Sequence, residues 1–341
     1  MVEFGNLSYD EQVARLTELA HVVLEAYGLS SEDYGLSCVS HWQNSTFRVD
    51  VLRGELAGRY ALRINRPVSQ NVATIRSELQ WLDALNRDTK LHVPKPIKQR
   101  NGDLLTSIYT RQVEETRHCV LFKWIEGEFL DGELTPRHMI LVGEFMAKLH
   151  NHSASFESPA GFIRNNLEWA GQMRTFYEEK ELDSSPAISK DTWTLFHQVR
   201  TRVEPRMCAL GNESSTFGLI HNDIYQKNML FHQGQVRVLD FDNCGWAHYL
   251  LDIAVTLAQV RKHPDYLAKR NALLTGYRNY RMFSDDEEQL LDEFIAARIM
   301  LLALYMASQI ENEQMKAKAP AYVVTVAEDL RRWMAGGRIY G

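Results

Sequence analysis

Two carboxylates and one amide, Asp223, Asn228 and Asp240, follow one another closely in the second half of the chain. Asp223 comes at the start of a loop that follows an apolar stretch, and Asn228 comes at the end of the same loop. Residues 229–239 then have the pattern of a β-hairpin, which would return Asp240 to the side of Asn228. Hard oxygen ligands in this number suit Mg²⁺, which typically binds one or two carboxylates together with substrate phosphates.

Phosphoryl transfer is the chemistry that this set of side chains predicts. The metal would neutralise the phosphates, and Asp223 would stay free to orient a substrate hydroxyl or to accept its proton. A lone D-x-x-x-x-N carries no signal, and Asp240-Phe241-Asp242 near a strand end is also compatible with simple turn chemistry. The full pattern, His221-x-Asp223-x-x-x-x-Asn228 followed by a hairpin and Asp-Phe, is much more specific.

The hydrophobic spacing around this segment divides the chain into two parts. Residues 1–124 begin with a helix, for which Ser8 and Glu11 form a capping box, and continue with short strands and a second helix. Residues 125–341 are mostly helical, and a β pattern returns only at Gly218 to Asp242. We therefore expect an α+β protein with a small antiparallel-sheet lobe, residues 1–124, and a larger mainly helical lobe, residues 125–341.

The composition is that of an ordinary globular protein, with 341 residues, 45% hydrophobic and 24% charged. There are 38 Lys and Arg against 44 Asp and Glu, and this net charge of -6 argues against non-specific nucleic-acid binding. The start of the chain lacks the pattern of a signal peptide, and the most apolar stretch, Phe294 to Ala307, is short and contains Arg298. The four cysteines form no C-x-x-C pair. These features predict a cytoplasmic protein without a membrane partner. The sequence gives no indication of the oligomeric state.

The motif segment resembles a known family. The spacing of His221, Asp223 and Asn228 resembles the H-x-D-x-x-x-x-N catalytic loop of the protein-kinase-like fold. Residues 239–245, with Asp252-Ile253-Ala254 after them, are similar to the D-F-D-x-x-x-G…D-L-A pattern of the aminoglycoside phosphotransferase and choline kinase superfamily, which includes homoserine kinases of type II. The resemblance extends from about Tyr34 to Leu257, and it implies the two-lobed kinase fold.

By this resemblance, Asp223 is the catalytic base or the residue that orients the hydroxyl, and Asn228 and Asp240 hold Mg²⁺. The implied reaction transfers the γ-phosphoryl group of Mg-ATP to the hydroxyl of a small molecule.

Three neighbours of these residues have supporting roles by the same resemblance. His221 is expected to brace the loop rather than to take part in the chemistry. Asp242 either assists the metal or is a turn or helix-capping carboxylate, and both interpretations stay open. Asp252 is expected to hydrogen-bond to the loop backbone.

The first lobe of such kinases places a cation over the ATP phosphates, held by an acid on a helix. Arg63 on the third strand and Glu78 on the next helix resemble this pair, with Arg in place of the usual Lys, while an ordinary ion pair is the alternative. The glycine-rich phosphate loop is absent, and residues 41–46 stand in its place. Asn44, Ser45 and Thr46 are its candidate phosphate contacts, although a plain hairpin turn would have the same pattern.

Three functions fit the resemblance. The first is a metabolic kinase that acts on an amino alcohol such as homoserine or choline. The second is an aminoglycoside phosphotransferase that inactivates an antibiotic. The third is a non-catalytic nucleotide-binding regulator. The intact Asp223, Asn228 and Asp240 argue against this function, whereas Arg63 and the loop without glycine leave it open.

Overall fold

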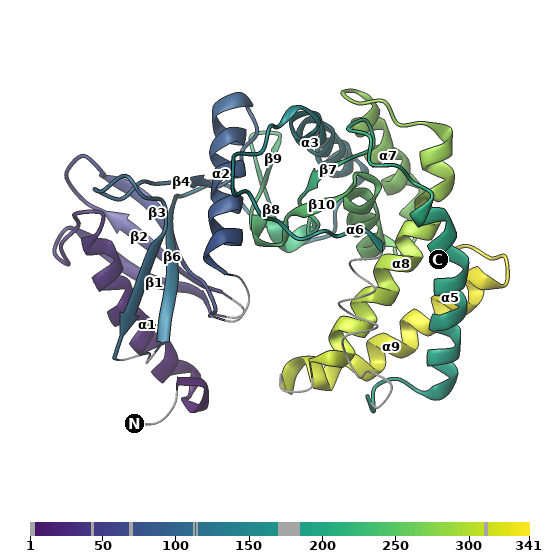
Figure 1. The fold of residues 1–341 in the computed structure, drawn as a ribbon, viewed down its shortest axis with the longest axis horizontal. Coiled ribbons are helices and arrows are strands. Elements are labelled where there is room, and N and C mark those ends of the chain that lie inside the picture. Colours follow the sequence, from purple (N-terminus) through teal and green to yellow (C-terminus); the bar gives the residue numbers. More distant parts are fainter. Residues whose placement is uncertain are drawn as a thin grey trace. The chain divides into compact units, whose positions relative to one another are not determined.

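The computed structural model describes residues 4–41, 44–67, 71–111, 113, 115–169, 185–309 and 313–341. The chain forms two compact units (Figure 1). Unit 1 comprises Met1–Gly127 and Ser158–Ile163, and unit 2 comprises Glu128–Glu157 and Arg164–Gly341. Trp42 and Gln43 of the expected phosphate loop lie outside the described residues.

Unit 1 is built on one antiparallel sheet with the strand order β1-β2-β3-β6-β4, and β5 also pairs with β6. Its strands are β1 (Tyr34–His41), β2 (Ser45–Val51), β3 (Gly58–Ile64), β4 (Lys95–Pro96), β5 (Thr106–Thr110) and β6 (Glu115–Lys123). In β2 every second residue is buried, because successive side chains of a strand point to opposite faces. Phe47 and Val49 thus enter the core of the unit.

Two long helices accompany this sheet, α1 (Tyr9–Glu25) and α2 (Val72–Asp88). The expected capping box of Ser8 and Glu11 begins α1, whose apolar face packs with Phe47 and Leu62 in one cluster of buried side chains. Helix α2 begins at the N-cap Asn71, whose side chain accepts the backbone N–H of Thr74.

Unit 2 is mainly helical, with α3 (Pro136–Ser155), α5 (Lys190–Cys208), α6 (Leu250–Val260), α7 (Tyr266–Arg278), α8 (Asp285–Ser308) and α9 (Glu313–Met334). Helices α3 and α7 approach closely at two glycines. A Cβ on Gly143 would lie 2.0 Å from the carbonyl oxygen of Leu273, and one on Gly276 would lie 2.1 Å from that of Ile140. Only glycine permits this crossing, which fixes the helix that supplies His150.

Two short antiparallel strand pairs lie among these helices, and they position the motif segment. Strand β7 (Phe217–Ile220) pairs with β10 (Gly245–His248), and β8 (Met229–His232) pairs with β9 (Gln235–Val238). The expected hairpin is therefore present, and its turn residues Gln233 and Gly234 have positive φ, as a type I′ turn requires. The α+β fold class predicted from the sequence is confirmed.

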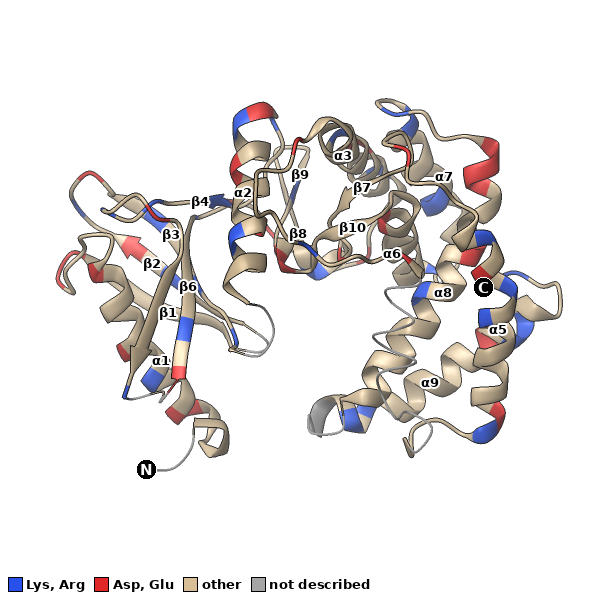
Figure 2. Cartoon of the chain, viewed as in Figure 1, with Lys and Arg blue, Asp and Glu red and all other residues tan. Residues whose placement is uncertain are grey.

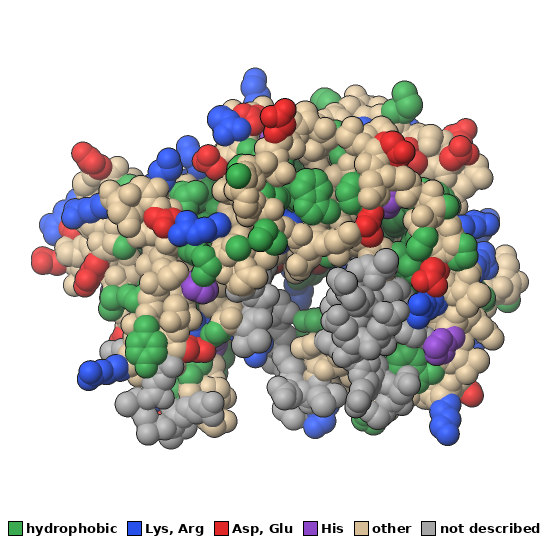
Figure 3. Space-filling model, viewed as in Figure 1, with side chains coloured by type: hydrophobic (Ala, Val, Ile, Leu, Met, Phe, Trp, Pro, Cys, Tyr) green, Lys and Arg blue, Asp and Glu red, His purple; other side chains and the backbone are tan. Residues whose placement is uncertain are grey.

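Residues of both charge signs are interspersed along the elements of both units (Figure 2). On the face drawn in Figure 3, Lys and Arg stand among Asp and Glu rather than in a patch of one sign. Within the described ranges, no helix is both long and apolar enough to cross a membrane.

Candidate active site

His221 anchors the start of the candidate catalytic loop directly after β7. Its side chain is fully buried, and its Nδ1 accepts the backbone N–H of Asp223 at 3.1 Å. Because Nδ1 is an acceptor, Nε2 carries the proton and donates to the carbonyl oxygen of Leu239 at 2.9 Å. The ring also packs edge-on against Phe241, with 4.5 Å between the ring centroids. These contacts connect the start of the loop with the segment at Leu239 to Phe241.

Asp223 and Asn228 lie side by side across the loop. The side-chain amide of Asn228 donates to the backbone oxygen of Asp223 and to its Oδ2, both at 3.0 Å. The preceding residue, Asn222, has φ of 65°, a left-handed conformation that Asn tolerates better than most residues. The carboxylate of Asp223 remains 25% exposed, so a ligand can reach it.

Asp240 follows the hairpin, whose geometry returns it to the loop. The backbone N–H of Leu239 donates to the carbonyl oxygen of Asn228 at 2.9 Å, which places Asp240 next to that residue in space. Asp240 itself is left-handed, with φ of 62° and ψ of 71°. Strained backbone of this kind occurs where surrounding contacts enforce it, often at functional sites. Burial raises the pKa of Tyr225, and the negative charges of Asp223 and Asp240 raise it further.

Asp252, at the start of α6, holds the loop backbone as expected. Its buried carboxylate accepts the backbone N–H groups of His221 at 3.0 Å and Asn222 at 2.6 Å, together with Nε2 of His150 at 3.0 Å. Burial alone would raise the pKa of Asp252, but these hydrogen bonds and the adjacent imidazoles bring the pKa below its usual value. Burial lowers the pKa of His150, so the pair consists of a carboxylate and a neutral imidazole.

The donor set of the loop fits a small divalent cation. The amide nitrogen of Asn228 is engaged by Asp223, which leaves its Oδ1 as the atom for a metal, and Asp240 adds a carboxylate. Asp242 is buried and lies in the short helical turn Phe241–Asn243, which directly follows Asp240. Across the described residues, no group of three or more His, Cys, Asp or Glu side chains forms a complete metal cage. Mg²⁺ needs no such cage, because it binds one or two carboxylates and completes its shell with water and substrate phosphates.

In unit 1, the structure brings Arg63 and Glu78 together. Nη1 of Arg63 donates to Oε1 of Glu78 at 2.8 Å, and Nη2 donates to Oε2 at 2.7 Å. The side chains are only 9% and 0% exposed. The guanidinium also lies over the ring of Phe122, 5.2 Å from its centroid. This is a buried, bidentate ion pair that holds a cation in a fixed position.

The three candidate phosphate contacts lie in different environments. Asn44 precedes β2, and its Oδ1 accepts the backbone N–H of Arg66 at 3.3 Å. Ser45 and Thr46 lie in β2 itself and not in a loop. The hydroxyl of Ser45 is buried and lies 2.7 Å from Nδ1 of His41, while Thr46 is half-buried. Their contacts with phosphate remain predictions.

Two arginines near the loop were not predicted as site residues. Arg164, which is buried, donates to the carbonyl oxygens of Cys244, at 2.7 Å, and Asp242, and thereby fixes the segment after Asp240. Arg298 on α8 places Nη2 3.8 Å from Oδ1 of Asp223. The only signal in the sequence was that Arg298 interrupts an otherwise apolar stretch.

Comparison with known proteins shows the family to which the chain belongs. A model of the phosphotransferase enzyme family matches residues 38–283. A solved microcompartment-associated aminopropanol kinase superposes with a TM-score of 0.82 at 25% identity, covering 94% of this chain and 98% of that one. An amicoumacin kinase solved with AMP-PNP and Ca²⁺ shares the fold, with a TM-score of 0.75 at 17% identity and coverage of 94% and 96%.

A homoserine kinase of Gluconobacter oxydans is 24% identical over 312 residues, which are 86% of this chain and 90% of the relative. The family match includes both the Arg63–Glu78 pair and the loop from His221 to Asp252. The chain therefore belongs to the phosphotransferase enzyme family, and it is a small-molecule kinase.

Proposed function

We propose that this kinase transfers the γ-phosphoryl group of ATP to the hydroxyl of a small amino alcohol, with Mg²⁺ as the metal. The observation that carries the proposal is the loop after β7, where Asp223 is held by Asn228 and His221 and still exposes its carboxylate. Phosphoryl transfer depends on such positioning more than on covalent chemistry by the protein.

The proposed step involves one bond made and one bond broken. The acceptor's hydroxyl oxygen bonds to the γ-phosphorus, the bond from that phosphorus to the β–γ bridging oxygen breaks, and ADP leaves. Asp223 orients the hydroxyl and accepts its proton. Asn228 and Asp240 would hold Mg²⁺, which neutralises phosphate charge when bound, and Asp242 would assist them.

Unit 1 would supply the contacts to the rest of the nucleotide. Arg63, oriented by Glu78, is proposed to bind the phosphates of ATP, as a planar fork in place of the point charge of a lysine. Asn44, Ser45 and Thr46 are proposed as further contacts to phosphate. Of these, Ser45 would first have to exchange its partner His41 for the ligand.

The acceptor class is supported by two relatives whose names specify amino alcohols, the aminopropanol kinase and the homoserine kinase. An antibiotic acceptor is the second candidate, because the amicoumacin kinase shares the fold over 94% of this chain.

The test is a screen of ADP formation with ATP and Mg²⁺ over amino alcohols, hydroxy amino acids, sugars and antibiotics, including aminoglycosides and amicoumacin. We expect an amino alcohol or hydroxy amino acid to give the highest kcat/KM. Turnover of an antibiotic alone would favour the second candidate, and ADP formation that no acceptor stimulates would contradict the proposal.

A further inference from the structure

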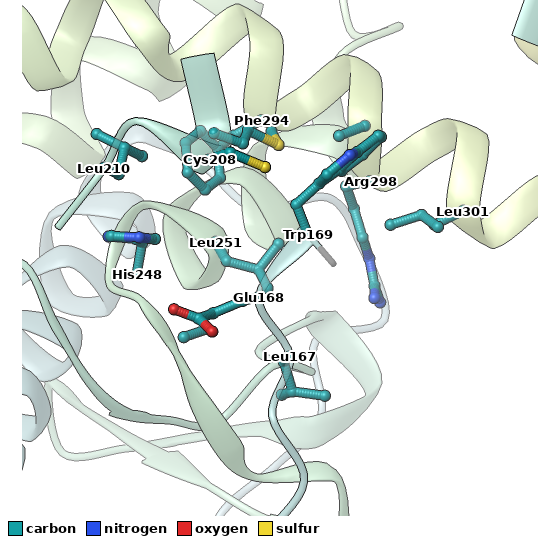
Figure 4. Close-up of a pocket in the computed structure, with 13 residues that line it drawn as sticks. Leu167, Glu168, Trp169, Cys208, Leu210, His248, Leu251, Phe294, Arg298 and Leu301 are labelled. Atoms are coloured by element: carbon teal, nitrogen blue, oxygen red, sulfur yellow. The ribbon is translucent and has the colours of Figure 1, made fainter. Parts of the chain in front are cut away.

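A pocket of about 200 Å³ lies wholly within unit 2 (Figure 4). It is lined by residues 167–169, the end of α5, strand β10, and helices α6 and α8. Most of the lining is apolar, and its charged or titratable side chains are Glu168, His248 and Arg298, together with the thiol of Cys208. Small-molecule sites have this composition, and those for drug-sized ligands measure about 300 to 1,000 Å³, so this pocket suits a smaller molecule.

Arg298 connects the pocket to the proposed catalytic carboxylate. Its guanidinium lines the pocket, and Nη2 lies 3.8 Å from Oδ1 of Asp223, which is close enough for an ion pair but too long for a hydrogen bond. The side chain is only 19% exposed, and it makes no hydrogen bond to any residue in the described ranges. A guanidinium that is mostly buried needs hydrogen-bond acceptors, since desolvation without them is costly. An anionic group on a ligand would provide them.

A carboxylate lies on the opposite side of the pocket. In Figure 4, Glu168 extends toward His248, away from the guanidinium of Arg298. Its Oε2 accepts a hydrogen bond from Nδ2 of Asn166 at 2.6 Å, and Oε1 has no hydrogen bond within the described part of the chain. The buried indole N–H of Trp169 also lacks a partner among those residues. The pocket thus has an acceptor for a cation at one side and donors for an anion at the other.

We propose that this pocket binds the phosphoryl acceptor as a zwitterion, with a carboxylate on Arg298, an ammonium group on Glu168 and the hydroxyl at Asp223. The acceptor is then a small hydroxy amino acid and not an amino alcohol that carries only positive charge. This inference rests on the proposed kinase function and narrows its acceptor class.

The charges of Arg298 and Glu168 favour a ligand that carries both a carboxylate and an ammonium group over a ligand that carries only one of them. The planar fork of a guanidinium matches a carboxylate with two parallel hydrogen bonds. An acceptor without a carboxylate would leave the guanidinium of Arg298 with its long ion pair to Asp223 but without a hydrogen-bond acceptor, and its ammonium group would bring a second positive charge into the same small pocket. Sites discriminate strongly against ligands that leave their buried polar groups unpaired.

The test compares matched acceptors on the full-length kinase with ATP and Mg²⁺. L-Homoserine is compared with 3-amino-1-propanol, which lacks only the carboxylate, and with 4-hydroxybutanoate, which lacks only the ammonium group. L-Serine, ethanolamine and 3-hydroxypropanoate form a second, shorter series. In at least one series, we expect kcat/KM for the amino acid to exceed that for the compound without the carboxylate by about 30-fold or more.

Variants assign the selectivity to residues. Arg298→Gln should abolish the preference for the carboxylate, mainly through KM, and Glu168→Gln should reduce the preference for the ammonium group. Arg298→Lys keeps the positive charge but loses the planar guanidinium, so it should retain part of the preference for acceptors with a carboxylate. This variant also keeps the test decisive if Arg298→Gln fails to fold. Arg137→Gln, at an exposed arginine of α3, is the matched control and should change neither preference.

Two results would overturn the inference and leave the kinase function standing. One is turnover of the compounds without a carboxylate at least as efficient as that of the amino acids. The other is an Arg298→Gln variant that lowers kcat by the same factor for every acceptor, which would place the guanidinium on the transferred phosphoryl group. If no acceptor of any class stimulates ADP formation, the proposed function itself fails.

Discussion

Replacing one member of the Arg63–Glu78 pair should destabilise the protein more than replacing both. The side chains are 9% and 0% exposed and share two hydrogen bonds of 2.8 and 2.7 Å. Arg63→Met or Glu78→Met leaves an uncompensated buried charge, which costs about 3–5 kcal/mol. The double variant removes both charges, and apolar replacements of a buried pair are often neutral or stabilising. Urea denaturation of the four proteins therefore gives a double-mutant cycle with a large coupling free energy.

A matched control lies on the same helix. Arg76 makes a bidentate pair with Asp103 at 2.8 and 2.7 Å, but its side chain is 47% exposed. Arg76→Met should therefore cost only about 0–1 kcal/mol. A cost this small for Arg63→Met, or a double variant as unstable as the sum of the two single ones, would refute the reasoning. If the double variant is folded, its KM for ATP should still rise, because the proposed phosphate-binding cation is gone.

Three further predictions concern the helices and the loop. Gly143→Ala should lower the free energy of unfolding, measured by urea denaturation, by about 1–3 kcal/mol or more, because the new Cβ would lie 2.0 Å from a carbonyl oxygen. Gly132→Ala is the control and should change this free energy very little, because no atom lies within 4 Å of its Cβ position. Burial lowers the pKa of His150 from 6.5, so below about pH 6.5 the unfolded chain binds more protons than the folded one and the protein becomes less stable. His150→Gln should therefore reduce the fall in Tm between pH 7 and pH 5. The same fall in Tm in the variant and the wild type would contradict this prediction. Asp240→Asn should raise the Mg²⁺ concentration for half-maximal ADP formation at least about tenfold, and an unchanged requirement would exclude Asp240 as a ligand.

The parts of the fold that sequence reasoning identified correctly are governed by local chemistry. The capping box of Ser8 with Glu11 depends on two residues that are three apart in the sequence. The hairpin after Asn228 depends on a turn at Gln233 and Gly234. The close approach of Asp223 and Asn228 in the candidate catalytic loop could be predicted for the same reason, because both residues lie within one short segment.

The residues that were not predicted depend on long-range packing. Arg298 reaches Asp223 from a helix far along the chain, and Arg164 reaches Cys244 from an irregular segment. No local pattern connects either pair. Ser45 and Thr46 were expected in the loop of residues 41–46, but pairing with β1 and β3 places both residues in strand β2. Strand β10, four residues long, was missed because it is defined by its pairing with β7.

The most direct test of the proposed function is a comparison of Asp223→Asn with the wild type in two assays. Asp223 accepts hydrogen bonds from Asn228 and lies at the exposed side of the loop, so the change should abolish acceptor-dependent ADP formation. Calorimetric titration with ATP and Mg²⁺ should show nucleotide binding largely intact, because Arg63, Asn228 and Asp240 remain. An Asp223→Asn variant that still phosphorylates its acceptor at a rate near that of the wild type would contradict the account.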